Sequence, residues 1–78
     1  MTIDELAKAC GHRIEDHLTG GYDKHQDPWH LARSFKGAWL ATHVIGAEKG
    51  EAHLLNLDKD ALIALREGIN RRLQELED

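Results

Sequence analysis

The chain has 78 residues and one cysteine, so a disulfide within it is excluded, and its length predicts a single domain over residues 1–78. Apolar residues make up 41% and charged residues 31%, which is ordinary for a folded protein and argues against disorder. The net charge of −4 is uneven, because residues 1–27 and 51–78 carry −3 each whereas residues 28–50 carry +2. Overall acidity disfavours a nucleic-acid binder, since such a protein usually needs a basic surface to neutralise phosphates.

The amino-terminal sequence begins acidic and lacks the apolar run of a secretory signal. No apolar stretch approaches the roughly 20 residues that cross a bilayer. We therefore expect a cytoplasmic protein that does not bind membranes.

The first expected element is a helix over residues 3–18. Thr2 and Glu5 have the T-x-x-E spacing of a capping box, in which side chains satisfy the free backbone donors of a helix start. The TGG sequence at residues 19–21 is expected to end this helix, because glycine reaches the left-handed conformation of a helix terminus. Its apolar stripe recurs at steps of three and four and comprises Ile3, Leu6, Ala7, Cys10, Ile14, His17 and Leu18.

Residues 10–30 hold the cysteine and four of the six histidines, which raises the question of a metal site. His12 and His17 have an H-x₄-H spacing, but on a helix their rings would point about 140° apart. Cys10 and His17 share the apolar face, so we predict that they pack in a core and that no metal or cofactor is bound. A metal-binding helical domain remains the alternative, with candidate ligands Cys10, His17, His25 and His30. The histidines also raise the hypothesis of pH sensing.

The second expected element is a helix that begins at residue 28 and ends between residues 46 and 50. Asp27 is a favourable N-cap, and Pro28 suits the first helical position, where its missing N–H costs nothing. The apolar seam steps by 4, 3, 4 and 3 through Leu31, Phe35, Ala38, Thr42 and Ile45.

The third expected element is a helix from Asp58 to about Leu76, rich in strong helix formers. Its apolar stripe comprises Ala61, Leu62, Leu65, Ile69, Leu73 and Leu76. Residues 44–57 fit either a helix end with a loop and a short helical turn, or a β-hairpin with EKGE as its turn. The absence of strict alternation favours the helical alternative. The predicted fold class is therefore all-α, a small three-helix bundle.

The second expected helix carries more apolar surface than one neighbour can cover. On a helix, Trp29, Leu40 and Val44 would lie away from the main seam, while Trp39 would widen the seam. Either this is the central helix of the bundle, or its second side meets another chain. Tryptophan and arginine dominate interface energetics. The predicted partner-binding residues are Trp29, Arg33, Lys36, Trp39, Leu40 and Val44.

Besides the metal-binding domain, the sequence leaves two classes of non-enzymatic function. Cys10 would lie mid-helix on an apolar face, far from the groups that activate a thiol, so we predict that the chain is not an enzyme. The favoured function is a small protein-interaction module, of the regulatory or inhibitory accessory kind found in phages and mobile elements. Its partner would be another protein with an acidic surface, a second copy of the chain, or both. A small DNA-binding transcriptional regulator is the alternative, although neither expected helix start is rich in basic residues.

Overall fold

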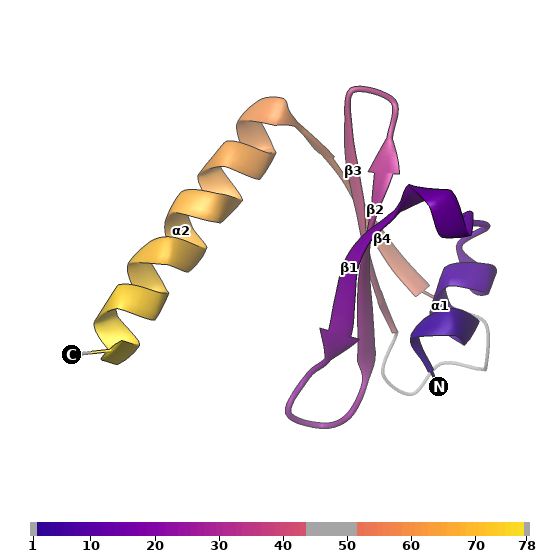
Figure 1. Cartoon of the computed structure of the whole chain (residues 1–78), viewed down its shortest axis with the longest axis horizontal. Coiled ribbons are helices and arrows are strands. Elements are labelled where there is room, and N and C mark those ends of the chain that lie inside the picture. The colour runs from indigo at the N-terminus through magenta and orange to yellow at the C-terminus, as the bar shows by residue number, and fades with distance from the viewer. Residues whose placement is uncertain (1, 44–51, 78) are drawn as a thin grey trace.

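The computed structural model describes residues 2–43 and 52–77 and has a mixed α/β fold (Figure 1). A four-stranded antiparallel sheet in the order β1-β2-β3-β4 is flanked by a short amino-terminal helix and a long carboxy-terminal helix. The elements in chain order are α1 (Ile3–Ala9), the 3₁₀ helix η1 (Ile14–Asp16), β1 (His17–Tyr22), β2 (Pro28–Ser34), β3 (Gly37–His43), β4 (Ala52–Asp58) and α2 (Lys59–Glu77). The predicted all-α three-helix bundle is therefore wrong.

The first predicted helix is correct at its start and too long at its end. The backbone N–H of Glu5 donates to Thr2 Oγ1 over 3.2 Å, so Thr2 caps α1 as expected. The helix stops at Ala9 because Gly11, two residues on, adopts a φ of 71°, which continues no right-handed helix. Residues 17–21, predicted to finish this helix and its stop, belong instead to strand β1, which ends at Tyr22.

The second predicted helix does not exist, because residues 28–43 form the hairpin β2–β3. Ser34 pairs with Gly37 across a turn made by Phe35 and Lys36, and Lys36 takes a φ of 63°. A side chain at Gly37 would collide with the backbone carbonyl oxygen of Leu57 on β4, so only glycine fits the close approach of the two strands there.

The apolar seam that suggested a helix has another origin. The hairpin carries apolar residues on both faces, since Trp29 and Leu31 point to one side and Ala32 to the other. A strand covered on both faces has a nearly continuous apolar sequence, without the alternation that identifies a half-exposed strand.

The helical interpretation of residues 44–57 is wrong over residues 52–57, which belong to β4. This strand pairs with β3 from Gly37 with Asp58 to His43 with Ala52. The EKGE sequence suggested as a hairpin turn lies outside the described residues.

The third predicted helix is confirmed. α2 runs from Lys59 to Glu77, and the backbone N–H of Ala61 donates to Asp58 Oδ1 over 2.9 Å, which makes Asp58 its N-cap. The expected and observed bounds differ by one residue at each end.

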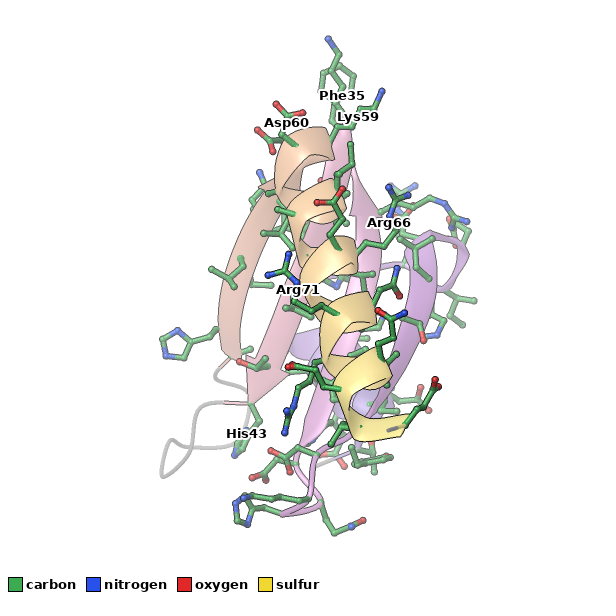
Figure 2. All side chains as sticks on the ribbon, turned by 90° about the vertical axis from the view of Figure 1, so that its left-hand side faces the viewer. Phe35, His43, Lys59, Asp60, Arg66 and Arg71 are labelled. Carbon is green, nitrogen blue, oxygen red and sulfur yellow. The ribbon has the colours of Figure 1, made fainter. Side chains whose placement is uncertain are left out.

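The two helices lie on opposite sides of the sheet (Figure 1). α1 packs mainly on β2, and the backbone N–H of Ile3 donates to Tyr22 Oη of β1 over 3.3 Å. Viewed from the side on which it lies, α2 crosses in front of the strands (Figure 2). Within the described residues, the buried apolar side chains are Leu6, Pro28, Ala32, Ala38 and Ala41. One leucine, one proline and three alanines make a very small core for a sheet of four strands.

Candidate interaction groove and histidine cluster

An apolar groove separates α2 from the strands beneath it. Its cavity measures about 500 Å³. The sheet contributes Trp29, Leu31 and Leu40, and the helix contributes Leu65 and Ile69. The remaining lining residues are Thr19, Asp23, Asp27, Pro28, Thr42 and His43. We call this space the α2 groove.

The strand register builds the floor of the α2 groove. Leu31 lies opposite Leu40, and side chains directly opposite one another in an antiparallel pair share a face. Trp29 is two residues from Leu31 and so points to the same face. Gly21 of β1 lies beside Trp29, and a Cβ there would be only 3.2 Å from the indole ring. The missing side chain of Gly21 gives the indole room over the neighbouring strand.

The helix side of the groove is an apolar stripe that the sheet covers only in part. We call Leu62, Leu65, Ile69, Leu73 and Leu76 the α2 stripe. Along it, Leu65 is 40% exposed, Ile69 50%, Leu73 52% and Leu76 64%. Exposure rises because α2 diverges from the sheet towards its carboxyl end (Figure 1). Across the described length of α2, no side chain is buried.

Two of the predicted partner-binding residues, Trp29 and Leu40, meet in the α2 groove. Trp39 lies on the other face of the sheet, because it pairs with Ala32 rather than with a groove residue. Arg33 is on the groove face but further along β2, where its Nη1 donates to the backbone carbonyl of Glu15 over 2.9 Å. The predicted partner-binding residues, which would lie together on a helix, are therefore divided between the two faces of the sheet.

Lys36 belongs to a different part of the surface. Its Nζ lies 5.3 Å from the ring centroid of Phe35 in the β2–β3 turn. It shares a second cavity, of about 580 Å³, with Lys59 and Arg66 at the start of α2. Figure 2 shows Phe35 and Lys59 at this same end of the molecule. Three cations therefore surround one end of the groove face. Val44, the last predicted residue, lies outside the described residues.

A cluster of three histidines occupies the opposite face, under the end of α1. His12 Nδ1 and His30 Nδ1 are 3.2 Å apart, and His17 stacks on His30 with 4.8 Å between ring centroids. His30 is only 1% exposed. Burial, with smaller contributions from His17 and His12, lowers the pKa of His30 below its ordinary value, so this imidazole is held neutral.

The histidine cluster does not provide a metal site of the kind considered from the sequence. Of the candidate ligands, His17 and His30 come together, whereas His25 lies in the β1–β2 turn with its backbone N–H bonded to Asp23 Oδ1. Cys10 is half-buried, and burial raises the pKa of its thiol. Among residues 2–43 and 52–77, no group of three or more His, Cys, Asp or Glu side chains is arranged to hold a metal ion.

The sequence patterns did not predict that His12 lies beside His30, nor that the α2 stripe is exposed. The histidines meet because β1 pairs with β2 and α1 folds back on them, which no spacing along one helix indicates. The helical period predicts the stripe but places it in the core of a bundle. That part of the stripe extends past the sheet and is exposed follows only when the other elements are known to be strands.

Comparison of the chain with protein-family models, curated protein sequences and solved structures gives no match. Within the part of the chain that the structure describes, neither helix has the length and apolar character needed to cross a membrane.

Proposed function

We propose that this chain is a small non-enzymatic interaction module that binds an apolar segment of another protein chain along the α2 groove and the α2 stripe. The observation that carries the proposal is the apolar surface of the groove and the stripe: Trp29 and Leu40 line the groove from the sheet, and Ile69 and Leu73 of the α2 stripe are each at least half exposed. A stripe on a helix facing a hydrophobic groove is a recurrent mode of protein recognition.

The size of this surface favours a protein over a small molecule. A ligand filling a cavity of about 500 Å³ would cover Leu65 and Ile69, which line it. Leu73 and Leu76 extend past the lining and are more than half exposed. Contiguous apolar surface of this kind marks interaction sites in soluble proteins.

The small core supports the same proposal. A chain of this length buries only about 60% of its unfolded surface and commonly gains stability from association. Here the buried apolar side chains within the described residues are one leucine, one proline and three alanines. Covering the α2 groove would enlarge that core.

The chemistry of the described residues gives little support to catalysis. The raised pKa of Cys10 keeps the thiol protonated at neutral pH, whereas a nucleophilic cysteine needs a lowered pKa.

The DNA-binding alternative is weakened because residues 28–43, one of the two helices expected to contact DNA, form strands. The cations Lys36, Lys59 and Arg66 at one end of the groove fit a protein partner with acidic side chains there.

Site-specific photo-crosslinking in living cells tests the proposal. The photoreactive residue p-benzoylphenylalanine replaces Leu73 in one variant and Ile14 in a control, since Ile14 is equally apolar, 93% exposed and remote from the groove. We expect a discrete crosslinked product only from position 73. Adding Leu65→Glu should remove this product, whereas Glu67→Lys, outside the stripe, should retain it. The absence of a product at position 73, or the same products at both positions, would overturn the proposal.

A further inference from the structure

We infer that the segment bound by the α2 groove is α2 of a second copy of this chain, paired antiparallel with the first around Ile69. This inference rests on the proposed function and names the partner. It is carried by the symmetry of the α2 stripe, by the charges at the two ends of α2 and by the open groove beside it.

The α2 stripe has the same spacing in both directions. From Leu62 the steps are 3, 4, 4 and 3 residues, through Leu65, Ile69 and Leu73 to Leu76. At 3.6 residues per turn, all five side chains fall within about 40° of the direction of Ile69. In an antiparallel pair centred on Ile69, Leu62 faces Leu76 of the other copy, Leu65 faces Leu73, and Ile69 faces itself. Every apolar residue of the stripe then meets an apolar residue.

The charges at the helix ends favour the antiparallel direction. Lys59 and Glu77 lie on the same flank of the stripe, each about 80° from Ile69. An antiparallel pair brings Lys59 of one copy beside Glu77 of the other at both ends. In a parallel pair, Lys59 and Glu77 would lie at opposite ends of the helices, and the two matching flanks would lie on opposite sides of the contact, so this ion pair could not form. The helix dipoles are also opposed in the antiparallel arrangement, so that unlike ends are adjacent.

On the other flank of the α2 stripe, the arginine nearest the contact already has an acidic partner on its own helix. Arg72 Nη1 lies 3.7 Å from Glu75 Oε1 of the same helix. Glu67 and Arg71 lie on the outer side of α2, about 160° from Ile69, and stay in water.

A second copy also suits the groove. A contact that is complementary to itself closes on a two-fold axis and forms a finite dimer. The second α2 would lie along the stripe where α2 diverges from the sheet, over the open side of the groove (Figure 1). Trp29 and Leu40 on the floor would then be shielded by apolar side chains. A partner unrelated in sequence would have no reason to match a stripe that is symmetric about its own centre.

The mass of the chain in solution, measured by size-exclusion chromatography with light scattering, is the first test. We expect twice the 8.8 kDa of the single chain at about 50 µM. Ile69→Lys and Ile69→Glu should each give the single-chain mass, because position 69 meets itself and like charges repel. Mixing the two variants should restore the double mass. Glu67→Lys, on the outer side, should remain a dimer. The rescue by mixing separates a broken interface from a variant that fails to fold.

Cysteine crosslinking tests the direction of pairing in a Cys10→Ser background. Chains carrying Leu65→Cys and chains carrying Leu73→Cys should form a mixed disulfide when combined. Leu65→Cys alone should form none. A disulfide from Leu65→Cys alone would indicate a parallel pair and overturn the inference, as would a dimer that survives Ile69→Lys.

The outcomes distinguish this inference from the proposed function. A wild-type chain of single mass whose position 73 still crosslinks to a different protein would refute the second copy and leave the interaction module standing. A chain of single mass that forms no product at position 73 would refute both.

Discussion

Gly37 and Gly68 both lack a Cβ, but a Cβ would meet very different surroundings at the two positions. A Cβ at Gly37 would collide with the carbonyl oxygen of Leu57, whereas nothing lies within 4 Å of one at Gly68. We expect Gly37→Ala to lower the free energy of unfolding by about 1–3 kcal/mol, as for other overpacked sites. Gly68→Ala should raise it by up to about 1 kcal/mol, because alanine is the better helix former. Urea denaturation of both variants checks this pair, and equal effects would contradict it.

His30 should make the stability of the protein depend on pH. Its folded pKa lies below the ordinary value of about 6.5, so the unfolded chain binds the proton more readily. Stability is then complete above about pH 6.5 and falls as the pH drops below it towards the folded pKa. The titratable and charged groups around His30 and its cavity are His12, His17, Asp4, Lys8 and Arg13.

Thermal denaturation at about pH 7.5 and 5.5 measures this dependence. The wild type should melt at a lower temperature at the acidic pH, and His30→Gln, which does not titrate, should lose much of that difference. The control His53→Gln changes an exposed histidine on β4 and should keep it. A difference that persists undiminished in His30→Gln would assign the pH dependence to other groups.

At the scale of elements, α2 could be predicted from sequence because its determinants are local. Asp58 caps it, strong helix formers fill it, and its apolar residues repeat at the helical period. The β2–β3 hairpin lacked such determinants. Trp29 and Leu31 point to one face and Ala32 to the other, so the strand lacks the alternation that would reveal its period. What makes Gly37 necessary is Leu57, 20 residues away in sequence, so no local pattern could reveal it.

The cap of α2 provides a prediction at this scale. Asp58→Ala should lower the free energy of unfolding by about 1 kcal/mol, because the backbone N–H of Ala61 loses its acceptor and the helix start loses a negative charge. Glu67→Ala, in the middle of the helix and on its outer side, is the matched control and should change stability little. Chemical denaturation followed by helical circular dichroism compares them. If the two variants have the same stability, Asp58 is not an effective cap.

For the whole molecule, the two faces of the sheet differ in how they are covered. One is closed by α1, with Leu6 fully buried. The other is opposed by a helix that stands away from it and carries no buried side chain over its described length. The sequence pattern predicted surplus apolar surface near Trp29 and Leu40, but it placed that surface on a helix that the strands β2 and β3 replace. It could not place that surface opposite the α2 stripe, because their proximity depends on the strand pairing of residues far apart in the chain.

If α2 pairs with α2 of a second copy, folding and association are one equilibrium. Each unfolded dimer releases two chains, so a hundredfold increase in concentration adds about 2.7 kcal/mol per dimer to the stability. The melting temperature should then rise by roughly 5–10 °C between about 5 and 500 µM. Ile69→Lys should melt lower and at a temperature independent of concentration, whereas Glu67→Lys should retain the dependence. A wild-type melting temperature that does not change over this range would mean that α2 does not pair with a second copy at these concentrations.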